Sequence, residues 1–247
     1  MAAEAHPGGG SANGWVVVGV VAFISLVCGG VALRAASHLR EARNHMHCVS
    51  RLKSMGIALH TFNDSVGYLP SEHDPNRPTF YKALLPFMEA ENAADNAPMV
   101  SYLCPSRRDV RTVPGKRDYG YASSDGETSV GTSVLDAPEL VNLGKIINGR
   151  GTTNTLLLSH LWLDPDHYTG GDPTDLGWAT KNNSRTISQP AIPDDNPAGS
   201  NRHIGGPHTR GLPSLFADAH VGIFRYDYPN FSQVWAYDNR DKITSPP

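Results

Sequence analysis

The stretch that decides the fold is WVVVGVVAFISLVCGGVAL, residues Trp15–Leu33, which contains no charged side chain. A helix needs about 20 apolar residues to cross the hydrocarbon core of a bilayer. We therefore expect a transmembrane helix over residues 15–34, after a short polar leader over residues 1–14. The alternative is a cleaved secretory signal. It would carry a basic segment before a shorter apolar core, and residues 1–14 contain no Lys or Arg.

The helical pattern continues beyond the apolar stretch. Apolar residues recur every three or four positions, at Leu39, Ala42, Met46, Val49, Leu52, Met55 and Leu59. This spacing places them on one face of an α-helix, and no proline follows before Pro70. The sequence predicts one helix from about Trp15 to Phe62. Its second section, residues 35–62, is amphipathic and packs one face on a globular domain.

The remaining residues, 63–247, are predicted to form a β-rich head with many loops. Short apolar runs alternate with stretches rich in turn-forming residues. These segments are a short helix over Thr79–Met88, a buried strand over Thr155–Trp162, a long loop over Leu163–Ser200, and a hairpin of Leu212–Ala217 and His220–Phe224 that turns at Asp218 and Ala219. Together they predict an α+β fold with a long N-terminal helix packed on a mostly antiparallel sheet.

Composition excludes several classes of function. The net charge of −3 and the pI near 6.4 leave no basic footprint for nucleic acid. The chain contains no G-x-S-x-G, H-E-x-x-H, phosphate-binding or dinucleotide-binding motif. We therefore expect no catalytic residues, no enzymatic activity and no nucleic-acid partner.

The chain has three cysteines, and only two of them form a plausible pair. Cys28 lies inside the apolar stretch, whereas Cys48 and Cys104 lie outside it. If the head is exported, a disulfide between Cys48 and Cys104 is reasonable. Two buried free thiols are an equal alternative. The cysteine spacing by itself matches neither a zinc motif nor a thioredoxin motif.

Histidines and carboxylates near the C-terminus form a weak candidate metal site. Its members are His203, His208, Asp218 and His220. Imidazole and carboxylate suit a transition metal, but a structural role is favoured. In that role His208 bonds a backbone group or Asp218, and Asp218 bonds the amides of its own turn.

Other polar and aromatic groups are weaker candidates. His45 and His47 are two apart on the predicted helix, so they point in different directions and are expected on a solvated face. No cofactor is expected, and the candidates for a calcium site are two polar runs: Asp194, Asp195 and Asn196, or Asp125, Glu127 and Ser129. Polar surface turns are favoured for both runs.

Six blocks of sequence, taken in order, resemble a known family. They are Cys48–Pro70 (CVSRLKSMGIALHTFNDSVGYLP), Leu84–Glu89 (LLPFME), Tyr102–Ser106 (YLCPS), Asp118–Ala122 (DYGYA), Ile147–Leu158 (INGRGTTNTLLL), and His208 followed by nine residues and Asp218. The pattern resembles a large bacterial family of prepilin-like domains of unknown function with a C-terminal H-x9-D-G motif. The resemblance extends from about Trp15 to Phe224, and it implies a fold like that of type IV pilins and type II secretion pseudopilins.

The resemblance implies a location and partners. It suggests cleavage by prepilin peptidase between Gly14 and Trp15, and a single-pass protein of the bacterial inner membrane with its head periplasmic or outside the cell. Inner-membrane lipid and other pilin-like or secretion-apparatus subunits would be its partners. The basic residues after the apolar stretch would place the head in the cytoplasm by the positive-inside rule, and the resemblance outweighs that count.

The chain also departs from the family pattern. Gly19 stands where the family has a glutamate that pairs with a neighbouring subunit, and the leader has no basic residue. These departures favour a minor or non-polymerising subunit. Ala219 replaces the glycine of the final motif, so the turn is expected to take another form. The alternative function is a membrane-tethered binding module for glycan or calcium. Its loop would be Asp164–Trp178, with Trp162, Trp178 and Tyr168 as apolar platforms.

Overall fold

The computed structural model describes residues 12–124, 130–181 and 185–240, without the side chains of residues 12–16 and 32. The chain divides into two units, Met1–Arg43 and Asn44–Pro247. Helix α1 (Ala12–Val66) contributes residues to both units. The single long helix is therefore confirmed, a few residues longer at each end than expected. It ends at Gly67, which has φ 89° and donates its N–H to the carbonyl of Asn63 at 2.7 Å.

In the first unit, the described part of α1 leaves its side chains exposed. Leu26 and Leu33 are 76% and 75% exposed, and every other described side chain from Val17 to Arg40 is exposed as well. The most apolar window of this helix has a mean hydropathy of 2.2. Among the described residues, it is the one helix long and apolar enough to span a membrane.

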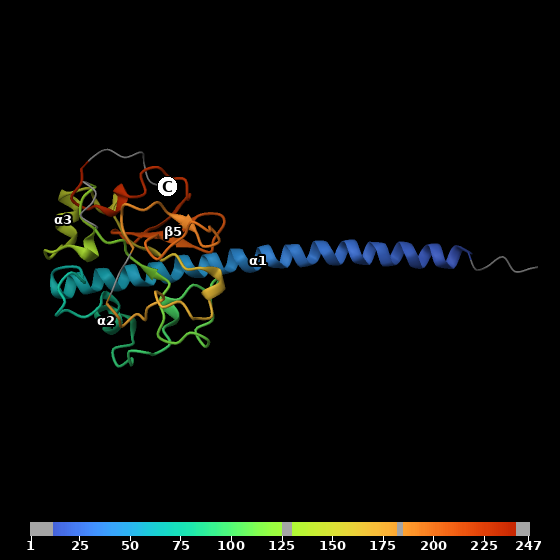
Figure 1. The fold of residues 1–247 in the computed structure, drawn as a ribbon, viewed down its shortest axis with the longest axis horizontal. Coiled ribbons are helices and arrows are strands. Elements are labelled where there is room, and N and C mark those ends of the chain that lie inside the picture. Colours follow the sequence, from blue (N-terminus) through green and yellow to red (C-terminus); the bar gives the residue numbers. More distant parts are fainter. Residues whose placement is uncertain (1–11, 125–129, 182–184, 241–247) are drawn as a thin grey trace, which may run out of the picture. The chain divides into compact units, whose positions relative to one another are not determined.

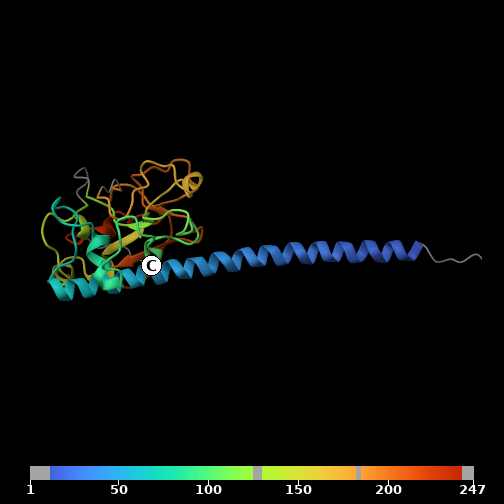
Figure 2. The ribbon, with the colours of Figure 1, turned by 90° about the horizontal axis from the view of Figure 1, so that it is seen from below.

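In the second unit, the last part of α1 is a core helix of the head. Leu52, Met55 and Leu59 of the predicted amphipathic face are completely buried, as is Cys48. The prediction was wrong for the start of this face, since Met46 is 64% exposed and Val49 is half-buried. Figure 2 shows this cyan section of α1 along one side of the head.

A four-stranded antiparallel sheet in the order β1-β2-β5-β6 packs into the same core. Its strands are β1 (Tyr119–Gly120), β2 (Leu156–His160), β5 (Leu212–Phe216) and β6 (Val221–Phe224). Ser159 pairs with Ser214, and Tyr119 pairs with His160. The predicted strand and hairpin are confirmed, and so is the α+β fold. Sequence reasoning did not identify β1.

Short elements complete the head (Figure 1). Helix α2 (Phe80–Leu84) begins where the hydroxyl of Thr79 accepts the N–H of Lys82, and it continues as a 3-10 turn over Leu85–Met88. Helix α3 is Leu143–Asn148, and the other 3-10 turns are Val100–Tyr102, Val134–Asp136, Thr152–Asn154, Pro165–His167 and Gln233–Trp235. The predicted long loop contains β3 (Ile192–Pro193), which runs parallel to β4 (Gly205–Gly206).

The turn of the β5–β6 hairpin lies against α1. His60 Nε2 is 2.8 Å from the carbonyl oxygen of Ala217. A Cβ added to Gly56 would lie 2.9 Å from Leu215 Cδ1 and 3.1 Å from Ala219 Cβ, so a larger residue would have to displace these neighbours. Ala219 has φ 67°. This is the left-handed region of backbone conformation, which favours glycine, and the expectation of a turn form different from that of the family stays a prediction.

Candidate functional site

Four buried side chains meet inside the head. We call them the Cys–His cluster: Cys48, Cys104, His160 and His208. Each is fully buried. One potential ligand atom from each residue lies within 4.8 Å of those of the other three. Among the described residues, this is the one group of three or more cysteine, histidine or acidic side chains that could hold a metal ion together.

The sulfur and nitrogen atoms of the cluster are close to one another. Cys48 Sγ and Cys104 Sγ are 3.1 Å apart. His208 Nε2 is 3.2 Å from Cys48 Sγ and 3.6 Å from Cys104 Sγ. The ring of His160 stands edge to face against His208, with centroids 5.2 Å apart. Neither ring nitrogen of His160 has a hydrogen-bond partner among the described residues.

Different elements hold each member of the cluster in place. Cys48 lies on the buried face of α1, and His160 ends β2 opposite Tyr119 of β1. The backbone N–H of Cys104 donates to Asp118 Oδ2 at 2.6 Å. The loop of His208 is fixed by the hydroxyl of Tyr226, which donates to the carbonyl of His208 at 3.1 Å. The cluster therefore joins the helix, the sheet and two loops.

Burial and contacts within the cluster shift the pKa values of His160, Cys48 and Cys104. Burial, reinforced by the nearby His208, lowers the pKa of His160 well below its usual value, so this imidazole is neutral. The nearby carbonyl of Pro213 acts to raise the same pKa, although its position does not meet the geometry of a hydrogen bond. The contact with Cys104 lowers the pKa of the Cys48 thiol, whereas burial raises that of Cys104. Cys48 is thus the thiol that ionises more readily.

A second buried cluster lies beside the first. We call it the arginine–aspartate network: Arg107, Arg108, Asp118, Asp175 and Asp194. Two Arg107–Asp194 bonds are both 2.9 Å, and the Arg108–Asp175 bonds are 2.7 and 3.0 Å. Asp118 Oδ1 is 3.1 Å from Arg107 and 2.6 Å from Arg108. Burial alone would raise the pKa of Asp118, but the charges of Arg108 and Arg107 hold that pKa below its usual value.

The structure brings together the two cysteines of the predicted pair. Both are free thiols, as is the exposed Cys28. The alternative of two buried thiols matches the structure as it stands. Because the sulfurs are adjacent, a disulfide between Cys48 and Cys104 stays a prediction for an oxidised chain.

The four residues of the predicted C-terminal metal site are not brought together as one group of ligand atoms. His208 joins the Cys–His cluster. Asp218 and His220 pair with each other at the hairpin turn, with Oδ1 and Nδ1 2.5 Å apart, and Asp218 also accepts the backbone N–H of His220 at 3.1 Å. His203 Nδ1 lies 2.9 Å from the hydroxyl of Ser200. The role of Asp218 in bonding its own turn is confirmed.

The two helix histidines have different environments. His47 is exposed, as expected for a solvated face. His45 is half-buried, with its ring edge to face against His208 at 4.9 Å between centroids, so the expectation of a solvated face was wrong for this residue. The predicted cleavage position at Gly14 and Trp15 falls on helical residues whose side chains lie outside the described part of the chain.

The calcium candidates have other roles or cannot be placed. Asp194 is buried and paired with Arg107, so a polar surface turn was the wrong prediction for it. Asp195 is exposed and Asn196 is half-buried. The second run, Asp125, Glu127 and Ser129, lies outside the described residues.

The aromatic platforms proposed for a ligand-binding loop are mostly internal. Trp178 is completely buried, and its Nε1 donates to the carbonyl of Ala97 at 3.0 Å. Trp162 and Tyr168 are half-buried, and the hydroxyl of Tyr168 donates to Asp194 at 2.7 Å. Trp178 anchors the loop in the core and offers no surface to a glycan.

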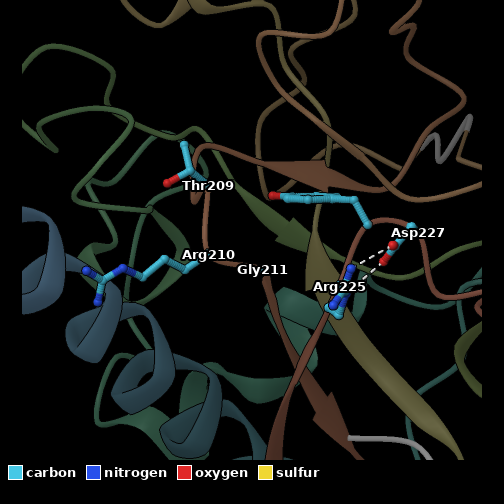
Figure 3. Close-up of a pocket in the computed structure, with 6 residues that line it drawn as sticks. Thr209, Arg210, Gly211, Arg225 and Asp227 are labelled. Carbon is cyan, nitrogen blue, oxygen red and sulfur yellow. Dashed lines mark hydrogen bonds and ion pairs between the residues drawn. The ribbon is translucent and has the colours of Figure 1, made fainter.

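An open hollow of about 490 Å³ lies between the segments Thr209–Gly211 and Arg225–Asp227. Figure 3 shows the guanidinium of Arg225 turned to Asp227 of the same segment. This pair is exposed, with 82% and 69% of the two side chains accessible. Arg225 is thus already neutralised by its neighbour, and Arg210 is the other arginine that lines the hollow.

Sequence reasoning missed His160 and the arginine–aspartate network. His160 ends the apolar run LLLSH, all of whose residues are buried. A histidine inside a predicted buried strand was the available signal. The adjacent Arg107 and Arg108 gave no comparable signal, because charged pairs of residues are usually solvated.

The comparisons with known proteins reach only part of the chain. No curated protein and no solved structure matches the chain. Residues 37–101 match a family described as a protein of unknown function (DUF1559). This segment includes Cys48 and the buried face of α1, but it ends before Cys104. Over residues 37–101, therefore, the chain is similar to the DUF1559 family.

Proposed function

We propose that the protein is a membrane-anchored, pseudopilin-like structural subunit of a secretion- or pilus-like assembly in the bacterial envelope. The observation that carries this proposal is the contrast within α1. Side chains from Val17 to Leu33 are exposed wherever they are described and, apart from Ser25, apolar, whereas Cys48, Leu52 and Leu59 are core residues of the head. One helix thus supplies both an anchor and a core element.

Physical chemistry supports lipid as the surroundings of the first section. Exposed apolar surface costs about 25 cal/mol per Å² in water. Its large exposed side chains are Val17, Val18, Val20, Val21, Phe23, Ile24, Leu26, Val27, Val31 and Leu33. A helix satisfies its own backbone hydrogen bonds, so it can cross a bilayer without water. Immersion in lipid removes the cost of exposing these side chains.

A minor or non-polymerising role follows from the absence of a carboxylate in the apolar section. A charged group is costly inside a bilayer and persists there when it has a partner. Gly19 supplies no such group, and no atom lies within 4 Å of the position that its Cβ would occupy. A neighbouring subunit would therefore find no charge partner at this position. We propose a structural role with no catalytic step, in contact with lipid and other envelope subunits.

Cysteine labelling of the full chain tests the anchor and the side of the membrane together. The background is Cys28→Ser, because Cys48 and Cys104 are buried and protected from reagent. Thr169, an exposed residue of the long loop, is then changed to Cys. We expect the chain to remain in membranes after alkaline carbonate extraction. In intact spheroplasts, a membrane-impermeant maleimide should label Thr169→Cys and leave the parent unlabelled.

Labelling of Thr169→Cys only after permeabilisation would place the head in the cytoplasm and overturn the export part of the proposal. Mass spectrometry of the N-terminus is the second measurement. A mature chain that begins at a methylated Trp15 supports pilin-like processing, and an intact first residue would contradict that mechanism.

A further inference from the structure

We propose that Cys48, Cys104, His160 and His208 bind one transition-metal ion of the Zn²⁺ class, which fastens the last section of α1 to the sheet of the head. The proposal rests on four buried donor atoms that converge from four distant parts of the sequence. It is independent of the membrane role, because all four residues belong to the second unit.

The donor set matches the chemistry of zinc. Structural zinc sites are four-coordinate and tetrahedral, and two cysteines with two histidines form one of the usual sets. Thiolate and imidazole also favour zinc over calcium or magnesium, which take oxygen ligands. The nearest carboxylate network is already occupied, since Asp118 faces Arg107 and Arg108.

The distances between donors lie close to those of a tetrahedral site. Metal bonds of ~2.3 Å to sulfur and ~2.0–2.1 Å to nitrogen place two sulfurs about 3.8 Å apart, and a sulfur and a nitrogen about 3.6 Å apart. His208 Nε2 is 3.6 Å from Cys104 Sγ and 3.2 Å from Cys48 Sγ. The two sulfurs, now 3.1 Å apart, would separate by about 0.7 Å on binding, and every pair of donor atoms, those of His160 included, lies within 4.8 Å.

The histidines favour a metal over a disulfide at this place. A disulfide would join the two sulfurs and leave both nitrogens of His160 without hydrogen bonds, as they are now. A buried polar group without a partner costs about 1–3 kcal/mol. A metal ion gives one nitrogen of His160 a partner and binds the two thiols at the same time.

Charge balance also supports the proposal. Binding breaks the two S–H bonds and releases both protons to solvent. Two thiolates and one divalent ion sum to zero charge, and the two imidazoles are neutral. A buried site without net charge avoids the large cost of burying an ion alone.

Neighbouring groups are arranged as outer-sphere partners. The carboxylate of Asp118 holds the backbone amide of Cys104. The hydroxyl of Tyr119 is buried without a hydrogen-bond partner among the described residues. It lies near enough to Cys48 to help lower the pKa of that thiol. Such second contacts orient ligands and stabilise thiolates in metal sites.

The test uses the full chain purified in detergent under reducing conditions. We expect elemental analysis to find one zinc per chain after extensive dialysis. The chain is then unfolded with a chelator and refolded with Co²⁺. We expect intense visible d–d bands typical of tetrahedral coordination and a near-ultraviolet sulfur-to-cobalt charge-transfer band.

Two variants separate this ligand set from the one suggested by the sequence. His160→Phe fills the same space without a ligand atom, so it should lose the bound metal and the tetrahedral bands. His220→Gln is the matched control, because His220 lies outside the cluster and should leave both unchanged. Loss of metal in His220→Gln, with retention in His160→Phe, would overturn the assignment.

The parent chain gives a decisive result even if His160→Phe fails to fold. A folded parent that contains no zinc and gives no tetrahedral cobalt bands would overturn the proposal. So would a parent whose intact mass under native conditions is lower by two hydrogens, because that mass shows a Cys48–Cys104 disulfide. Neither outcome bears on the membrane role, which the labelling experiment decides.

Discussion

The head contains two neighbouring buried polar clusters that differ in how their charges and hydrogen bonds are balanced. In the arginine–aspartate network, each carboxylate faces at least one guanidinium. Only Nε of Arg108 lacks a hydrogen-bond partner among the described residues. In the Cys–His cluster, both ring nitrogens of His160 lack one. The first cluster balances its charges within the protein, whereas the second presents donor atoms to a group from outside.

This difference shows which buried polar residues are candidates for binding. Burial alone does not distinguish the two clusters, because both are almost inaccessible. Buried ion pairs of complementary charge are commonly structural. Unsatisfied ligand atoms of matching chemistry are the better indication of a site. The predictions below test the comparison from the largest expected effect to the smallest.

Removing a charge from the arginine–aspartate network should have the largest effect on the stability of the head. Arg107→Met leaves Asp194 buried without its guanidinium partner, and it removes one of the two guanidinium groups that face Asp118. Removal of one partner from a buried pair costs about 3–5 kcal/mol. We expect a loss of that size in the free energy of unfolding, measured by urea denaturation of the full chain in detergent.

The control for Arg107→Met is Arg225→Met. It breaks a fully exposed pair with Asp227, and exposed pairs contribute little. We expect an unchanged denaturation midpoint. Equal midpoints for the two variants would show that the buried network does not stabilise the head.

Acid should weaken the same network. The pKa of Asp118 is lower in the folded state than its usual value of ~3.9. Its contribution to stability is therefore complete above the unfolded-state pKa and is lost as the pH falls through the folded-state pKa. We expect the urea concentration at the denaturation midpoint to decrease once the pH is lowered below about 4. Asp118→Asn should reduce that pH dependence, and an undiminished dependence in this variant would contradict the assignment.

Adding a side chain where α1 contacts the hairpin should have an intermediate effect on stability. Gly56→Val places its Cβ against Leu215 and Ala219, and overpacking of this kind costs about 1–3 kcal/mol. We expect a loss of that size in the free energy of unfolding of the head. The matched control is Gly29→Val, where no atom lies within 4 Å of the new Cβ. If both variants denature alike, the hairpin does not need glycine at position 56.

The smallest effect should come from His160→Phe in protein freed of metal. Without a metal ion, the substitution removes two buried nitrogens that lack hydrogen bonds. We expect the free energy of unfolding to rise by about 1 kcal/mol in the presence of a chelator. A large decrease in the free energy of unfolding under those conditions would show that His160 has a structural partner within the protein.

The sequence determined the parts of the fold that depend on local pattern. Trp15–Leu33 predicted an apolar helix, and the three- and four-residue spacing predicted its buried face at Leu52, Met55 and Leu59. The strand at Leu156–His160 and the β5–β6 hairpin follow from short apolar runs bounded by turn residues. These signals lie within one element, so neighbouring residues are sufficient to read them.

Only the tertiary structure decided which polar residues meet. Cys48, Cys104, His160 and His208 come from four distant parts of the chain, and no short motif links them. The sequence pattern grouped His208 with Asp218 and His220 because the three are near in sequence. In the structure, the packing of α1 on the sheet places His208 beside the thiols of Cys48 and Cys104. Chain proximity and spatial proximity differ here because the core is built from long-range contacts between the helix, the sheet and the loops.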